Sequence, residues 1–254
     1  EAPAAVGELA RRTRNWASLH RWPWPIWRAR GGAELELSGE RFFFADAAAP
    51  ELSFWTQATR HGRWETAPLA ELRAVLRPGD VLLDIGAFIG AYTLLGSRLV
   101  GPEGRVVAFE PDGRARARLE RNLRRNGAAN VTVLPYAVGD HDGPVRFSAS
   151  GDSVGHVDAR GDSDVEMVTL DGICAALDVT PDVIKMDIEG GELAVIHGST
   201  AARLARNLVL EVHEREIRAL GGDPSRLLSQ LPGWRLLERD RPGYYRVTVG
   251  PRGS

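Results

Sequence analysis

The chain lacks the features that mark secreted, membrane-spanning and nucleic-acid-binding proteins. Cys174 is its one cysteine, which excludes an internal disulfide and fits a reducing compartment. No apolar run is long enough to cross a bilayer. The 34 acidic and 32 basic residues nearly cancel, so the net charge gives no general attraction to nucleic acid. We therefore expect a cytoplasmic protein with no membrane span and no nucleic-acid partner. The N-terminus shows no signal-peptide pattern, although it opens on Glu1 rather than on methionine.

The first 66 residues differ in composition from the rest. At 254 residues the chain can hold one large domain, which we expect at 67–250, preceded by a helical and hairpin extension at 1–66. Residues 34–44 alternate in polarity and predict a hairpin that turns at Ser38-Gly39. The extension also holds tryptophans among arginines and prolines: Trp16, Trp22, Trp24 and Trp27. A lid, a homodimer contact and a membrane-surface patch are open roles for them, but ordinary packing is the simplest.

From Val81 onward, apolar runs of strand length alternate with amphipathic stretches. We predict strands at 81–84, 105–109, 131–135, 182–187, 207–212, 234–239 and 244–249. The predicted helices are 67–76, 91–100, 112–126, 170–177, 190–203, 214–220 and 224–230. The link 239–243 is too short for a crossover helix, so the last two strands should form an antiparallel hairpin. Within an insertion at 139–170, we interpret 145–147 and 166–168 as paired strands.

This order of elements predicts an α/β fold. We expect a Rossmann-like, seven-stranded, mostly parallel sheet with an antiparallel last strand and helices on both faces. That arrangement is typical of class I methyltransferases rather than of dehydrogenases.

A glycine-containing turn, Asp84 to Gly90, lies between the first predicted core strand and a helix start. Glycines allow a tight turn and the close approach of a ligand, and free N–H groups at a helix start attract negative charge. Glu110 closes the next strand, where an acid can bind two ribose hydroxyls. A pyrophosphate-binding G-x-G-x-x-G turn would carry glycine where Phe88 stands. We therefore predict a nucleoside cofactor with a compact zwitterionic tail, such as S-adenosylmethionine.

Further motifs resemble those of the FkbM family of S-adenosylmethionine-dependent methyltransferases, over about residues 60–250. The most specific is Ile184-Lys185-Met186-Asp187-Ile188-Glu189-Gly190-x-Glu192. The others are Arg77-Pro78-Gly79-Asp80, Asp84-Ile85-Gly86-Ala87-x-Ile89-Gly90-x-x-Thr93, Phe109-Glu110-Pro111, Asn122 with Asn126, Ala137-Val138-Gly139-Asp140, and Val168-Thr169-Leu170-Asp171. The family usually carries Asn where Phe88 stands, so one side-chain contact to the cofactor tail is expected to be missing.

The resemblance implies a cofactor-site role for each matching residue. The methionine part of the cofactor would be surrounded by the turn motif: Asp84, Gly86, Ala87, Phe88, Gly90 and Thr93. Glu110 would bind the ribose and Pro111 would pack near the adenine. The adenine edge would meet backbone or carboxylate groups of Ala137, Val138 and Asp140, and Asp187 would face the sulfonium methyl.

Polar side chains end the fourth and fifth predicted core strands. Residues two apart in a strand share a face, so Lys185 aligns with Asp187, and Glu211 with His213. An alcohol is a poor nucleophile until its proton is withdrawn, so methyl transfer to oxygen needs a base or a metal that lowers the hydroxyl pKa. Asp187, Glu211 and His213 could serve as bases or could bind Mg²⁺, an ion that prefers oxygen ligands. Both alternatives stay open at this point.

Lys185 is the only lysine of the chain, and its predicted strand should be buried. Arginine does not release its proton in a protein, whereas a desolvated lysine can. Lys185 could therefore be a base or a charge partner that fixes Asp187. The alternative is a structural ion pair with Asp187 or Glu211.

The family resemblance implies O-methylation of a sugar or of a polyketide or peptide natural product. N-methylation of an amine is the alternative, and a cofactor-binding subunit without catalysis of its own is a third hypothesis. Four residues are candidates for acceptor contacts: Glu65, at a position where the family often has Glu, His61 and His156 on predicted loops, and Glu189 after the fourth core strand.

Overall fold

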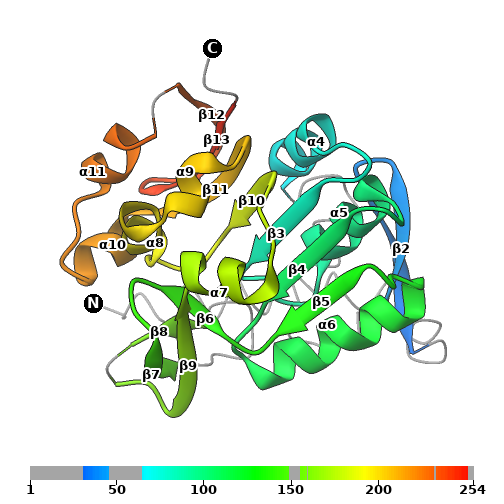
Figure 1. Cartoon of the computed structure of the whole chain (residues 1–254), viewed down its shortest axis with the longest axis horizontal. Coiled ribbons are helices and arrows are strands. Elements are labelled where there is room, and N and C mark those ends of the chain that lie inside the picture. The colour runs from blue at the N-terminus through cyan, green and yellow to red at the C-terminus, as the bar shows by residue number, and fades with distance from the viewer. Residues whose placement is uncertain (1–30, 46–64, 149–154, 159, 232, 251–254) are drawn as a thin grey trace, which may run out of the picture.

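A seven-stranded sheet forms the centre of the computed structural model, which describes residues 31–45, 65–148, 155–158, 160–231 and 233–250 (Figure 1). The strand order is β12 (Trp234–Arg241), β13 (Tyr244–Val249), β11 (Asn207–His213), β10 (Val183–Met186), β3 (Val81–Ile85), β4 (Arg105–Phe109) and β5 (Val131–Leu134). From β11 to β5 all neighbours are parallel, whereas β13 is antiparallel to both β11 and β12. The predicted fold class and the reversed last strand are confirmed.

Helices cover both faces of this sheet, as predicted (Figure 1). Leu82 and Val106 belong to a core shared with α4 (Thr66–Val75), α5 (Ala91–Val100) and α6 (Gly113–Asn126). Their neighbours Leu83 and Val107 belong to a second core. The alternation follows from the two-residue period of a strand, and burial on both faces explains why β3 and β4 are mostly apolar.

The second core is shared with five shorter helices: α7 (Leu170–Leu177), α8 (Glu192–Gly198), α9 (Thr200–Leu204), α10 (Glu214–Ala219) and α11 (Pro224–Ser229). Across the described parts of the chain, no helix is long and apolar enough to cross a membrane.

The predicted N-terminal hairpin is confirmed as β1 (Gly32–Leu37) and β2 (Glu40–Ala45), which turn at Ser38-Gly39. The side-chain oxygens of Asn122 and Asn126 on α6 accept hydrogen bonds of 2.8 Å from backbone N–H groups of β2. Apolar residues of the hairpin join the core on the α6 side of the sheet. Trp16, Trp22, Trp24 and Trp27 lie outside the described residues.

The insertion and the short strand just before it form a separate sheet, in the order β6 (Ala137–Gly139), β9 (Ser163–Thr169), β7 (Gly143–Ser148) and β8 (His156–Val157). β7 and β9 are antiparallel, which confirms the predicted pairing of the two short runs.

The single helix predicted at 190–203 is wrong, because it is two helices, α8 and α9. Ser199 between them is extended, and its side chain accepts a hydrogen bond of 3.0 Å from Ala202 N at the start of α9. Asp171 on α7 accepts from Ser199 Oγ at 2.7 Å and from the backbone N–H groups of Thr200 and Ala201 at 2.8 Å each. These side chains accept hydrogen bonds from the free N–H groups at the start of α9. One helix therefore ends before Ser199 and a second begins after it.

Candidate active site

Two glycines shape the turn after β3. Gly86 and Gly90 have φ values of 78° and 93°, in the left-handed region that favours glycine. A Cβ atom at Gly86 would overlap the carbonyl oxygen of Asp187, the residue that follows β10. The turn therefore lies directly against the end of the neighbouring strand, and no larger residue would allow that approach.

A buried carboxylate lies at the base of this turn. Asp84 is fully buried, and its Oδ2 accepts a hydrogen bond of 2.5 Å from Thr93 Oγ1 on α5. The Nζ of Lys185 lies 3.4 Å from Asp84 Oδ1. Burial raises the pKa of Asp84, and Lys185 and Thr93 oppose that rise by stabilising the ionised form.

Lys185 connects the turn to the residue after β10. Its Nζ donates to the carbonyl oxygen of Gly86 at 2.8 Å and lies 3.9 Å from Asp187 Oδ2, as predicted from their shared face. The same nitrogen lies 4.9 Å from the ring centre of Tyr92. Burial alone would lower the pKa of Lys185, but Asp84 and Asp187 raise it above its usual value. Lys185 is therefore held as a cation.

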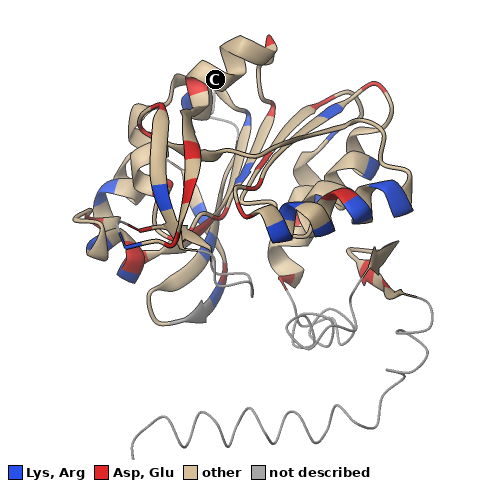
Figure 2. Cartoon of the chain, turned by 90° about the horizontal axis from the view of Figure 1, so that it is seen from below, with Lys and Arg blue, Asp and Glu red and all other residues tan. Residues whose placement is uncertain are grey.

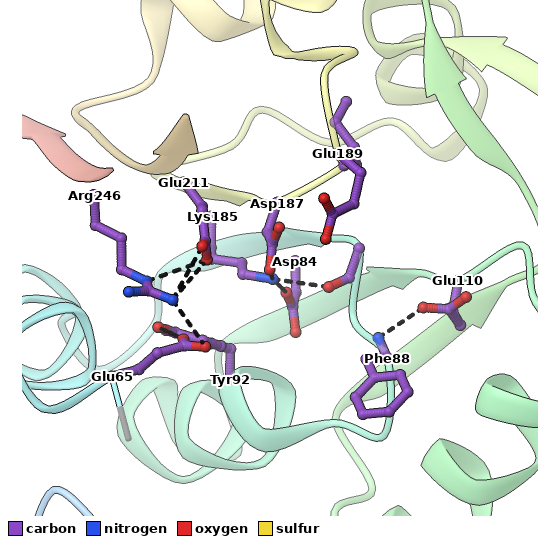
Figure 3. Close-up of polar contacts among 12 residues, drawn as sticks. Glu65, Asp84, Phe88, Tyr92, Glu110, Lys185, Asp187, Glu189, Glu211 and Arg246 are labelled. Carbon is purple, nitrogen blue, oxygen red and sulfur yellow. Dashed lines mark hydrogen bonds and ion pairs between the residues drawn. The ribbon is translucent and has the colours of Figure 1, made fainter. Parts of the chain in front are cut away.

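Glu110 follows β4 and lies across the turn (Figure 3). Its two carboxylate oxygens accept hydrogen bonds from Phe88 N at 2.7 Å and from Asp112 N at 2.9 Å. Burial raises the pKa of Glu110 to about 7, although both N–H groups stabilise the charged form.

Carboxylates and one imidazole gather where β10 and β11 end. The Nε2 of His213 lies 3.3 Å from Glu189 Oε2 and 3.7 Å from oxygens of both Asp187 and Glu211. Its other nitrogen, Nδ1, is 2.9 Å from the buried Oε1 of Glu192 on α8. The predicted alignment of Glu211 with His213 is confirmed. Glu192 fixes the ring so that Nε2 faces the three carboxylates.

The pKa values in this cluster follow from burial and crowding. Burial raises the pKa of Glu189 to about 7 and that of Glu211 to about 8, with Asp187 adding to both. Burial would lower the pKa of His213, but Glu192 and the other carboxylates raise it to about 10. The imidazole is therefore a cation among acids.

Basic residues are concentrated on a different element, α6, whose 14 residues include six arginines and one glutamate (Figure 2). The arginine side chains of α6 are not part of the acidic cluster.

Arg246 and Tyr92 belong to the site although the sequence analysis singled out neither. Arg246 on β13 donates to both carboxylate oxygens of Glu211, at 3.0 and 3.1 Å. It also lies 3.5 Å from Glu65, which accepts a short hydrogen bond from the Tyr92 hydroxyl. Figure 3 shows these side chains converging from β11, β13, α5 and the start of α4.

Three non-glycine residues of the site have left-handed backbones: Glu65, Phe88 and Glu189, with φ values of 44°, 49° and 54°. Among the described residues only Ser38 and Asp178 share that property. Such conformations cost free energy and persist where the surroundings impose them. Two of the three, Phe88 and Glu189, lie in the turn after β3 and just after β10, so backbone strain is concentrated at the site.

Four further predicted site residues lie in or next to the small sheet. Asp140 is exposed and pairs with the adjacent His141 at 2.8 Å, while Ala137 and Val138 are buried in β6. His156 begins β8 in the small sheet, where its Nε2 lies 3.9 Å from Asp158. His61 lies outside the described residues.

The strand order, the glycine turn and the acid closing β4 define a class I methyltransferase. A family model described as "Methyltransferase FkbM domain" matches residues 84–239, more than half of the chain, and the protein belongs to this family. The resemblance found in the motifs is thereby confirmed.

Two named relatives share part of the chain. The hexuronic acid methyltransferase AglP of Haloferax volcanii is 32% identical over 141 residues, covering 53% of this chain and 56% of AglP. The AMB antimetabolite synthetase AmbE of Pseudomonas aeruginosa is 31% identical over 194 residues, covering 58% of this chain and 9% of AmbE. The chain thus spans about half of one relative and a small part of the other.

Among solved structures, M. jannaschii TYW2 in complex with AdoMet is 17% identical, with a TM-score of 0.46. The match covers 86% of this chain and 84% of TYW2.

Proposed function

We propose that this protein transfers the methyl group of S-adenosylmethionine to a hydroxyl oxygen of a sugar or of a polyketide or peptide natural product. The observation that carries the proposal is the cluster of Asp187, Glu189, Glu211 and His213 beside the Gly86 turn. The name of the relative AglP, a hexuronic acid methyltransferase, supports a sugar acceptor.

The residues on the cofactor side fit S-adenosylmethionine. The buried carboxylate of Glu110 suits the two ribose hydroxyls, and Asp84 provides negative charge near the turn for the cofactor amine. Gly86 gives the backbone a close approach that any side chain would block. When bound, the cofactor supplies an electrophilic methyl group on a positively charged sulfur.

Asp187 is the best-placed base for the acceptor hydroxyl. Its side chain is 27% exposed, more than Glu189 at 18% or His213 at 2%, and it adjoins the turn. Asp187 would take the hydroxyl proton as the oxygen–methyl bond forms and the sulfur–methyl bond breaks, leaving neutral S-adenosylhomocysteine. His213 and Lys185 hold their protons, so they serve as charge partners of the carboxylates rather than as bases.

A divalent cation is a second means of activating the hydroxyl, favoured by one specific observation. Asp187, Glu211 and His213 each offer one ligand atom, and these atoms all lie within 4.8 Å of one another. The donor set fits such an ion once His213 releases its Nε2 proton, which the charge of a bound cation would favour. Glu192 already orients the imidazole as metal-bound histidines are usually oriented. A bound Mg²⁺ would lower the hydroxyl pKa.

Chelation distinguishes the two routes. If a metal is required, dialysis against EDTA abolishes turnover, Mg²⁺ restores it, and added Mg²⁺ raises the melting temperature of wild-type protein but not of Asp187→Asn. Turnover that survives EDTA leaves Asp187 as base without metal.

The central experiment uses isotope-labelled S-adenosylmethionine and a panel of neutral sugars, uronic acids, hydroxylated polyketides and peptides. We expect mass spectrometry to find the label on an oxygen of one acceptor class. If Asp187→Ala combined with His213→Ala keeps nearly the full rate, transfer to an amine nitrogen gains support. Calorimetric binding of S-adenosylhomocysteine without transfer to any acceptor would favour a cofactor-binding subunit.

A further inference from the structure

Arg246 lies on β13, the middle one of three neighbouring strands at the proposed acceptor side of the site. The strand register places it directly across from Glu211 on β11 and from Glu238 on β12. Its Nε and Nη2 donate to the two oxygens of Glu211 at 3.1 and 3.0 Å, while Nη1 lies 3.9 Å from Glu238. A two-pronged guanidinium contact fixes the plane of a carboxylate as well as its position, which an ammonium group does not do.

The same guanidinium also holds Glu65. Arg246 Nη2 lies 3.5 Å from one oxygen of Glu65, and the Tyr92 hydroxyl donates to the other (Figure 3). The chain of contacts from Tyr92 through Glu65 and Arg246 to Glu211 therefore joins four segments that are far apart in sequence. All four side chains are largely buried, so water contributes little to holding them in place.

Glu211 needs this support because its other neighbours include like charges. Its Oε1 lies 3.7 Å from His213 Nε2, whereas Asp187 and Glu65 carry charge of the same sign as Glu211. Without the guanidinium, the carboxylate of Glu211 would lose both hydrogen bonds that fix its plane, and His213 would lose one of the groups that orient it.

We infer that Arg246 is a positioning residue for the acceptor side of the site. It sets the plane of the Glu211 carboxylate and thereby the arrangement of His213 and Asp187. This inference rests on the proposed function and deepens it, since Arg246 would act through Glu211 rather than on the acceptor itself.

The test compares Arg246→Met and Arg246→Lys with a matched control, Arg235→Met. Arg235 lies on the same hairpin and also contacts a glutamate, Glu71, at 2.9 Å, but its side chain is 61% exposed. We expect Arg246→Met to lower kcat about 100-fold while the Kd for S-adenosylhomocysteine stays within about 3-fold, because the cofactor side is untouched. Arg246→Lys should recover only part of kcat, and Arg235→Met should resemble wild type.

A double variant separates positioning from general stability. If Arg246 acts through Glu211, Arg246→Met combined with Glu211→Gln loses no more kcat than Glu211→Gln alone. Two losses that multiply would overturn the inference. So would an Arg246→Lys variant with wild-type kcat, or an Arg246→Met variant that loses only thermal stability.

A readout without turnover keeps the inference distinct from the proposed function. The ring NMR signals of His213 should shift in both Arg246 variants and not in Arg235→Met. If wild-type protein methylates no acceptor, the proposed function fails while the ring signals still test the positioning role. Unchanged ring signals in Arg246→Met would overturn that role.

Discussion

The proposed cofactor side and the proposed acceptor side of this site are built in different ways. On the cofactor side, Asp84, Gly86 and Glu110 come from two adjacent parallel strands, and backbone N–H groups hold the Glu110 carboxylate. On the acceptor side, side chains from β10, β11, β13 and the start of α4 hold one another through ion pairs. Local backbone geometry therefore determines the cofactor side, and side-chain contacts between distant residues determine the acceptor side.

Lys185→Met should have the largest effect because Lys185 contacts both sides. The substitution leaves the Asp84 carboxylate buried without its cation, and breaking such a pair typically lowers the free energy of unfolding by about 3–5 kcal/mol. We expect urea unfolding to show a loss of this size and calorimetry to show weaker binding of S-adenosylhomocysteine. Lys185→Arg keeps the charge, and unchanged turnover in that variant would exclude a proton-transfer role. If Lys185→Met impaired only cofactor binding or only turnover, Lys185 would not connect the two sides of the site.

Asp187→Asn should impair the acceptor side alone. We expect kcat to fall about 100-fold or more, because a positioned base contributes about that much, with little change in cofactor affinity. Asp164→Asn is the matched control, since Asp164 is exposed on β9 and pairs with Arg146. Single-turnover assays and calorimetry measure the two quantities, and an equal loss in both would contradict the separation of the sides.

Gly86→Ala should impair the cofactor side first. Its Cβ would meet the Asp187 carbonyl in a left-handed backbone, so we expect a loss of about 3 kcal/mol in unfolding free energy and much weaker cofactor binding. Gly79 has a φ of 89° with open space around it, so Gly79→Ala adds only the backbone strain, about 1 kcal/mol. Similar losses in both variants would show that the close approach at Gly86 does not matter.

The smallest effect is a pH dependence of cofactor affinity. Burial raises the pKa of Glu110 to about 7, so the carboxyl becomes ionised only as the pH rises through that value. Ribose hydroxyls donate better to a carboxylate than to a carboxylic acid. The Kd for S-adenosylhomocysteine should therefore fall by up to about tenfold between pH 6 and pH 8.

Glu110→Gln should bind more weakly and lose this pH dependence. The same raised pKa makes the Glu110 contribution to folding stability fall as the pH rises from its ordinary value of 4.5 toward 7, because the folded state binds the proton more tightly. If Glu110→Gln keeps the wild-type pH profile, another group is responsible.

The sequence predicted the fold and the cofactor side because both depend on local patterns. Apolar runs located the strands of the seven-stranded sheet to within one or two residues, and the short link before Tyr244 predicted the reversal of β13. Family motifs identified Asp84, Gly86 and Glu110. The roles assigned to these residues and to Asp187, and the domain boundary after residue 66, stay predictions.

The missed features depend on contacts between distant residues. The break between α8 and α9 depends on Asp171, which lies on a different helix. Arg246 had only a weak signal, because its pairing with Glu211 requires the register of an antiparallel strand. No pattern in the sequence indicated a site role for Tyr92, since an aromatic residue near a helix start is ordinarily part of the core.

The reversal of β13 also sets an order in which the site is completed. A growing chain that has reached β11 already contains Asp84, Gly86, Glu110, Asp187 and His213, but it still lacks the guanidinium of residue 246. Because β13 enters the sheet against the direction of its neighbours, the residues just past its turn arrive beside the end of β11. Synthesis therefore provides the residues of the proposed cofactor side before it provides the guanidinium that holds Glu211.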